Sequence, residues 1–157
     1  MIAVVALLFA AAFPSASRTS WMRPESFHLV VGMSRAEALK AVAVYKPKEQ
    51  NDEASFDYND SEGVTLQFHR DRLHAIRFEY FAFLQDARTA FEEERAFLQT
   101  TFGKPRKTTP ALIIYDDRLP NVMAVLSADP KSEQGKRGIG MLVVRYYDPV
   151  MMNKSEE

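Results

Sequence analysis

Hydrophobic residues recur at intervals of three and four positions in the middle of the chain. They are Ala87, Ala90, Phe91, Leu98 and Phe102, and this spacing places them on one side of a helix of 3.6 residues per turn. Asp86 is expected to be the N-cap, because its carboxylate accepts backbone N–H groups left unpaired in the first turn. Gly103 is expected to end the helix in a left-handed conformation, with Pro105 just beyond it. The pattern predicts a long amphipathic helix over residues 86–103.

Glu94 does not fit this pattern, because it falls near the middle of the apolar side, between Phe91 and Leu98. An unpaired buried carboxylate would cost several kcal/mol. Glu94 is therefore expected to be a buried charge paired with an arginine from the sheet, with Arg77 and Arg145 as candidates. The alternative is that Glu94 is a functional acid with a perturbed pKa.

The pattern before this helix predicts one short helix and three strands. Ser34 and Glu37 form a Ser-x-x-Glu capping box that opens a helix to about Tyr45. Apolar and polar residues then alternate with the period of two expected for half-buried strands. The three strands are expected near residues 54–58, 64–69 and 73–80. Arg70 and Asp71 are expected to form the tight turn between the second and third strands.

The same order follows the long helix. Strands are expected over residues 111–115, 122–126 and 139–147, with a polar and mobile loop over residues 128–138. The fold class is therefore α+β, a two-layer sandwich in which an antiparallel sheet of about six strands is covered by two helices. The order of elements is α-β-β-β-α-β-β-β, and its two similar halves are in keeping with a duplication.

The N-terminus differs in kind from the rest of the chain. Residues 1–17 are apolar and then small, which is typical of a secretory signal peptide cut before Arg18, although no basic residue precedes the apolar run. The alternative is a buried N-terminal helix or strand. Residues 18–25 are polar and expected to be mobile. A single α+β domain is expected over residues 27–148, followed by a polar tail over residues 149–157.

Composition narrows the classes of function. The chain has 157 residues, 46% of them hydrophobic, which fits one domain with a substantial core. Its formal net charge of −1 argues against a nucleic-acid-binding protein, because such proteins usually carry a concentrated positive excess. The absence of cysteine excludes thiol chemistry, thiolate metal sites and a lipid-anchoring cysteine.

The sequence contains no motif that identifies a catalytic, cofactor-binding or metal-binding residue. His69 and His74 flank a hairpin, but nothing in the spacing supplies a third metal ligand. Residues 57–63 resemble a calcium loop, but Gly63 falls at the seventh position and Phe68 replaces the glutamate at the twelfth. No phosphate-binding glycine loop, nucleophile elbow or zinc-protease motif occurs. We therefore expect no cofactor and no metal, and the sequence favours a protein that is not an enzyme without deciding the question.

Five tyrosines in the predicted strands are the candidate interaction residues. They are Tyr58, Tyr80, Tyr115, Tyr146 and Tyr147. On an open sheet face they would form a protein-recognition surface, because rigid amphipathic rings supply contact area at low entropic cost. The alternative is that these rings complete the core and its rim.

An export signal followed by Gly32, Met33, Ser34 and Glu37 at the start of a short helix, and then a three-stranded meander, resembles the small SmpA/OmlA and β-lactamase-inhibitor-protein-like domains. Residues 102–105 resemble the helix-ending Gly-x-Pro of such repeats. The chain departs from the lipoprotein members by lacking the anchor cysteine and from the inhibitors by lacking disulfides. The resemblance implies a non-catalytic, protein-binding role in the cell envelope or outside the cell.

Two hypotheses of function follow. The first is an exported, periplasmic or secreted, non-catalytic module that binds another protein of the envelope or the extracellular space, with no transmembrane segment in the mature chain. The second is a small-ligand carrier or enzyme with a pocket between helix and sheet that contains Glu94. An exposed aromatic sheet face favours the first hypothesis, and a pocket with an unpaired Glu94 favours the second.

Overall fold

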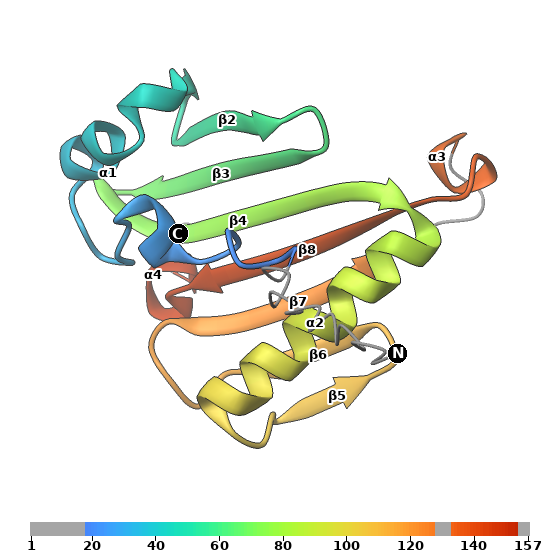
Figure 1. Ribbon diagram of the computed structural model, residues 1–157. Helices are drawn as coiled ribbons and strands as arrows, with labels where there is room; N and C mark the ends of the chain where they lie inside the picture. Colours follow the sequence, from blue (N-terminus) through green and yellow to red (C-terminus); the bar gives the residue numbers. More distant parts are fainter. Residues whose placement is uncertain (1–17, 128–132, 154–157) are drawn as a thin grey trace, which may run out of the picture.

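One antiparallel sheet of eight strands forms the body of the molecule (Figure 1). The computed structural model describes residues 18–127 and 133–153. The strands lie in the order β1-β2-β3-β4-β8-β7-β6-β5, and all neighbours are antiparallel. Their bounds are β1 (Lys48–Gln50), β2 (Glu53–Asn59), β3 (Glu62–His69), β4 (Arg72–Phe83), β5 (Lys107–Thr109), β6 (Leu112–Tyr115), β7 (Asn121–Ser127) and β8 (Ile139–Tyr147). The chain thus makes two runs of four strands, which meet where β4 pairs with β8.

The long helix α2 (Leu84–Phe102) follows β4 directly and crosses one face of the sheet, packed on β4, β7 and β8 (Figure 1). The other helices are short. They are α1 (Arg35–Ala41), α3 (Glu133–Lys136) and α4 (Pro149–Asn153), with the 3₁₀-helices η1 (Pro24–Phe27) and η2 (Ala43–Tyr45). The chain is therefore α+β, and α4 occupies the start of the predicted polar tail.

The expected sheet of about six strands under two helices is wrong. β1 and β5 are additional strands of three residues each, at the two edges of the sheet. Their side chains are almost all exposed, and neither strand contains an apolar residue. Short, charged edge strands are common because they discourage pairing with other chains. Because neither segment has an apolar face, the sequence pattern predicts a loop at both positions.

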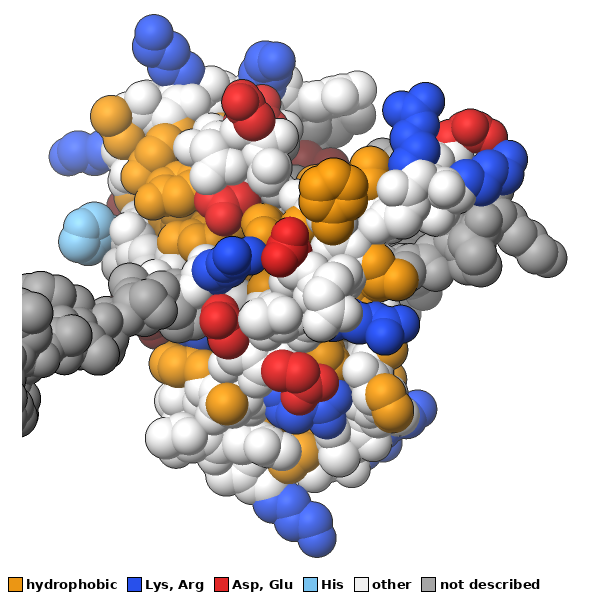
Figure 2. All heavy atoms as spheres, turned by 45° about the vertical axis from the view of Figure 1, so that its right-hand side comes forward, with side chains coloured by type: hydrophobic (Ala, Val, Ile, Leu, Met, Phe, Trp, Pro, Cys, Tyr) orange, Lys and Arg blue, Asp and Glu red, His pale blue; other side chains and the backbone are white. Residues whose placement is uncertain are grey.

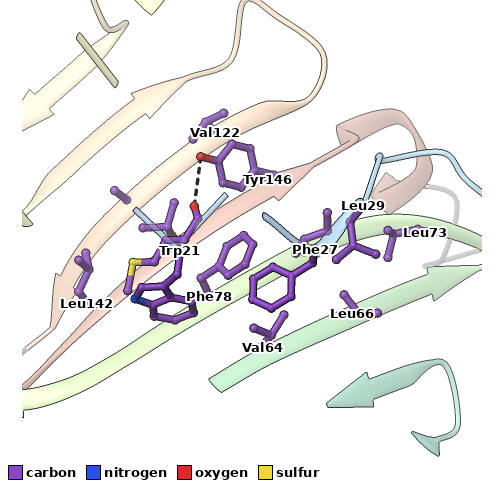
Figure 3. Close-up of a cluster of buried hydrophobic side chains, with 14 of the residues drawn as sticks. Trp21, Phe27, Leu29, Val64, Leu66, Leu73, Phe78, Val122, Leu142 and Tyr146 are labelled. Atoms are coloured by element: carbon purple, nitrogen blue, oxygen red, sulfur yellow. Dashed lines mark hydrogen bonds between the residues drawn. The ribbon is translucent and has the colours of Figure 1, made fainter. Parts of the chain in front are cut away.

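The layer that covers the sheet also differs from the expected pair of helices. Over β3 and β4 the cover is a largely irregular segment, residues 19–29, in which Trp21, Phe27 and Leu29 are buried (Figure 3). The Trp21 ring lies edge-on to Phe78, with 5.8 Å between the ring centroids. Burying each such side chain contributes about 2 kcal/mol. Most of residues 18–25, which we expected to be mobile, therefore belong to a segment that is packed on the sheet.

Two local predictions are confirmed. In the capping box, the Glu37 backbone N–H donates to Ser34 Oγ at 3.2 Å, and the Ser34 backbone N–H donates to the Glu37 carboxylate at 2.9 Å. Arg70 and Asp71 form the two-residue loop between β3 and β4, with φ of 48° and 59°. Positive φ at both positions is the geometry that a type I′ hairpin turn requires.

The ends of α2 differ from the expectation. The helix begins at Leu84 with Phe83 at the N-cap, so Asp86 lies inside the first turn and forms an ion pair with Arg18 at 3.3 Å. Gly103 ends the helix with a positive φ of 77°, but its ψ of −142° is not left-handed helical. The predicted signal peptide over residues 1–17 and residues 128–132 of the predicted loop lie outside the described residues.

Candidate functional site

The two faces of the sheet are unequal. Alternate side chains on the side of α2 form one continuous hydrophobic core, which includes Val64, Phe78, Val144 and Ile113. Side chains on the opposite face, called the uncovered face here, are mostly partly exposed. α1, α2 and the segment over residues 19–29 all lie on the core side (Figure 1). The described part of the chain therefore leaves the uncovered face open.

Apolar side chains gather on one half of the uncovered face. The register places Leu112 beside Val125 and Val125 beside Val143, and a second row brings Ile114 beside Met123. With Met141, these partly exposed residues form what we call the apolar strip, across β6, β7 and β8: Leu112, Ile114, Met123, Val125, Met141 and Val143. The strip is a contiguous surface rather than a set of scattered side chains.

Two arginines border the apolar strip. Arg145 on β8 lies directly opposite Arg77 on β4 in the register. Arg77 forms a 2.5 Å ion pair with Glu79, whereas Arg145 donates from Nη2 to the Gln67 side-chain oxygen at 2.7 Å. The Arg145 guanidinium also lies over the Tyr147 ring, 5.4 Å from its centroid. Arg145 thus joins an amide and an aromatic ring on this face.

The environment of Arg145 lacks a carboxylate in direct contact. No ion pair of Arg145 and no hydrogen bond of its Nε occurs among the described residues. Burial lowers the pKa of Arg145 and the charge of Arg77 adds to that fall, whereas Tyr147 and the Glu53 carboxylate oppose it. Like charges directly opposite each other on neighbouring strands repel. An acidic group from outside the described chain would therefore be favoured here.

The structure does not bring the five candidate tyrosines to one surface. Tyr147 alone among them lies on the uncovered face. Tyr115 and Tyr146 are buried in the core, and Tyr80 packs partly buried against it. Tyr58 is 41% exposed but stacks on Trp21 on the core side, with 5.2 Å between ring centroids.

The phase of each strand explains this separation. Tyr80 is two residues from Phe78 and Tyr146 is two residues from Val144, so each falls on the core side with its neighbour. Tyr147 falls on the other side for the same reason. The alternation of apolar and polar residues in the sequence is therefore enough to separate these tyrosines. The apolar strip, and the position of Arg145 beside it, were not predicted from the sequence.

Glu94 is completely buried under α2, with 0% of its surface exposed. Its Oε2 lies 2.7 Å from Nη1 of Arg23, which is itself 8% exposed. The candidate partners Arg77 and Arg145 were wrong, because both project from the opposite face of the sheet. Burial raises the pKa of Glu94 to about 7, and the charge of Arg23 opposes that rise.

Arg23 connects this buried pair to the core and to α2. Its Nη1 donates to the Met22 carbonyl at 2.8 Å, and its guanidinium stacks 3.5 Å from the centroid of the Phe97 ring. The Tyr146 hydroxyl donates to the same carbonyl at 3.5 Å, as the dashed line in Figure 3 shows. Burial raises the pKa of Tyr146, and the nearby Glu94 carboxylate adds to that rise.

A cavity of about 420 Å³ opens beside this cluster, between residues 23–31, the C-terminal half of α2 and the start of β7. Arg23 and Tyr146 line it, but Glu94 does not. A pocket between helix and sheet is therefore present, but it differs from the hypothesised one. Glu94 does not line it and is paired with Arg23. On the side seen in Figure 2, hydrophobic side chains form separate groups, with charged side chains of both signs between them.

The histidines give no metal centre in the described part of the chain. His69 and His74 lie close, with 6.4 Å between ring centroids, but no group of three or more histidine, aspartate or glutamate side chains is placed to hold a metal. Burial lowers the pKa of His74, and Arg145 lowers it further. Within residues 18–127 and 133–153, no helix is both long enough and apolar enough to span a membrane.

Comparison with known proteins adds no assignment. No family model, no curated protein and no solved structure matches this chain. The resemblance to SmpA/OmlA and β-lactamase-inhibitor-protein-like domains stays a prediction.

Proposed function

We propose that this chain is an exported, non-catalytic protein-binding module of the cell envelope or extracellular space, and that it binds its partner through the uncovered face of the sheet. The observation that carries the proposal is the apolar strip beside Arg145 and Tyr147. An apolar surface rimmed by polar residues is characteristic of protein–protein interaction sites.

The chemistry of the uncovered face supports a specific partner surface. Tyrosine and arginine are enriched among the residues that dominate binding energy, and here Tyr147 and Arg145 lie together beside the strip. Arg145 forms no ion pair among the described residues, so a carboxylate from the partner would supply one. The partner surface is therefore expected to combine apolar side chains with at least one acidic residue.

The decisive experiment captures partners with the full chain carrying a C-terminal tag, expressed in its source organism and cross-linked before extraction. Three versions are compared: wild type, Arg145→Glu and Arg88→Glu. Arg88 is exposed on α2, away from the uncovered face, so its variant is a control for the same change of charge. Thermal melts confirm that each version folds.

We expect a partner protein to be recovered equally with wild type and with Arg88→Glu. Its recovery with Arg145→Glu should be reduced at least about tenfold, because the introduced carboxylate would then face the acidic residue of the partner. Equal recovery with Arg145→Glu would refute binding through the uncovered face. Purified partner and chain then give the same ranking by calorimetry.

Export is tested separately by cell fractionation and N-terminal sequencing of the recovered chain. The continuous apolar run over residues 2–13 supports a cleaved signal peptide, so the mature chain is expected to begin at Arg18. Recovery from the cytoplasm with residues 1–17 still attached would refute export while leaving the binding face to be judged by the capture experiment.

A further inference from the structure

The cavity beside α2 is separate from the uncovered face, because it lies on the core side of the sheet, where Val122 and Tyr146 line it. Its volume of about 420 Å³ falls within the range of small-molecule sites. Most of its walls are apolar, and they are formed by Leu29, Val30, Val31, Phe97, Phe102 and Val122. Such walls favour an apolar group over a fully polar ligand.

Two arginines line this cavity, and each guanidinium is stacked on a phenylalanine. Arg118 lies 3.4 Å from the centroid of Phe102, and Arg23 lies 3.5 Å from the centroid of Phe97. Stacking fixes the plane of a guanidinium while leaving its N–H edge free to donate. The Nε atoms of both arginines are buried and have no hydrogen-bond partner among the described residues. These two Nε donors are thus oriented and unsatisfied.

The balance of charge leaves Arg118 as the cation available to a ligand. Arg23 already faces the Glu94 carboxylate at 2.7 Å. Arg118 forms no ion pair within the described residues, although the exposed Glu25 also lines the cavity. A planar guanidinium fork matches a carboxylate, which accepts two parallel hydrogen bonds from it.

We propose that this cavity binds an amphipathic carboxylate with a single hydrocarbon chain, whose chain lies along the apolar walls and whose carboxylate pairs with Arg118. Charge complementarity at Arg118 selects the head group, and the volume and apolar lining of the cavity select the chain. The site adds a ligand to the protein-binding role without depending on it, since the two surfaces lie on opposite faces of the sheet.

The test is isothermal titration of the purified chain with decanoate, kept below its micelle-forming concentration. Decanol and decylammonium are titrated in parallel, because they share the chain but replace the head group with a neutral or a positive one. We expect saturable binding of decanoate at one site. Decanol should bind about 10- to 100-fold more weakly, as the loss of a charge-assisted hydrogen bond predicts.

Three variants locate the ligand. Arg118→Gln removes the cation and should weaken decanoate about 10- to 100-fold while leaving decanol unchanged. Thr101→Trp, at an exposed position that lines the cavity, should block both ligands by filling the space. Arg88→Gln removes a charge from α2 outside the cavity and should bind like wild type.

The outcomes are decisive because folding is checked by a thermal melt of each variant. Arg118 also lies beside Phe102 at the C-terminal end of α2, where a cation is favourable for structure alone. If Arg118→Gln lowers the melting temperature but still binds decanoate as tightly as wild type does, that structural role is sufficient and the proposal is overturned. Undiminished binding to Thr101→Trp, or no binding to wild type, overturns it as well.

Discussion

Glu94 is subject to two opposing effects at the scale of a single residue. Complete burial disfavours its charge, whereas Arg23 at 2.7 Å favours it. Burial is the larger effect, and the pKa of Glu94 rises to about 7. The buried pair is therefore neutralised in part by proton uptake, not by Coulomb attraction alone.

Replacing Glu94 by glutamine tests which effect wins. Between pH 4.5 and about 7 the folded chain holds a proton on Glu94 that the unfolded chain has lost, so the wild-type free energy of unfolding falls as pH rises through this range. Glutamine cannot titrate. The free energy of unfolding of Glu94→Gln, minus that of wild type, should therefore increase by about 3 kcal/mol across this range. Urea denaturation at several pH values measures it.

Glu92→Gln is the matched control, because Glu92 is exposed on the same helix. Its difference from wild type should stay within about 0.5 kcal/mol at each pH. A difference for Glu94→Gln that decreases as pH rises would show that Arg23 holds the pKa of Glu94 below its ordinary value, contrary to this assignment.

The spacing of the long helix was enough to place Glu94 among apolar residues, but not to find its partner. Arg23 belongs to a segment that we expected to be mobile because of its proline and polar residues. Its side chain is held by long-range contacts, with Glu94 and Phe97 on α2. The pattern of neighbouring residues cannot predict such a pair, because its two members lie far apart in the sequence.

At the scale of elements, the close approach of α2 to β8 depends on Gly140. A Cβ atom at this position would lie 3.1 Å from the side chains of Ala87 and Leu84 and 3.3 Å from the Leu84 backbone. These distances are shorter than ordinary contacts, and one of the atoms is backbone. Helix and strand would have to separate to admit a side chain.

Gly140→Ala is expected to lower the free energy of unfolding by about 1–3 kcal/mol through overpacking, and Gly140→Val by more. Gly63→Ala on β3 is the control, since the nearest atoms to its added Cβ would be at 3.8 Å. That variant should be neutral or slightly stabilised, because alanine restricts the unfolded chain. Chemical denaturation gives all three values, and equal effects at Gly140 and Gly63 would contradict the packing argument.

The segment over residues 19–29 serves as a covering element over β3 and β4, beside α2. Trp21 is its main anchor, stacked on Tyr58 and edge-on to Phe78. Aromatic pairs of this kind add to the free energy of burial. The contribution of Trp21 should therefore be that of a core residue.

Trp21→Ala is expected to lower the free energy of unfolding by about 3–5 kcal/mol, the usual range for deleting a buried tryptophan. Phe83→Ala removes an aromatic ring that is 71% exposed and should change stability by no more than about 0.5 kcal/mol. Denaturation followed by circular dichroism compares the two. Comparable small effects would mean that the N-terminal segment is not part of the core.

The elements that could be predicted are those with strong local signals. The capping box at Ser34 and the turn at Arg70 and Asp71 are fixed by neighbouring residues, and both were found. β1 and β5 could not be found, because they have no apolar face and exist only as partners of β2 and β6. Each of these three-residue strands forms because a neighbouring strand is there to pair with it, and its own residues do not indicate a strand.

At the scale of the whole molecule, two runs of four strands join through one long pairing. β4 and β8 are paired from Ala75 with Tyr147 to Phe83 with Ile139. The core continues across this junction, and α2 packs on strands from both runs. The similar order of the two halves is in keeping with a duplication, but neither half has a core of its own.

A shared core predicts that the two halves unfold together. Trp21 is the one tryptophan in the sequence and lies over β4 in the first half, so its fluorescence reports on that half, whereas circular dichroism reports on both. Urea transitions followed by the two signals should coincide, as expected for a two-state domain. If the fluorescence transition came first, the first half would be an independent unit. The β4–β8 pairing would then be an interface between two domains rather than the centre of one.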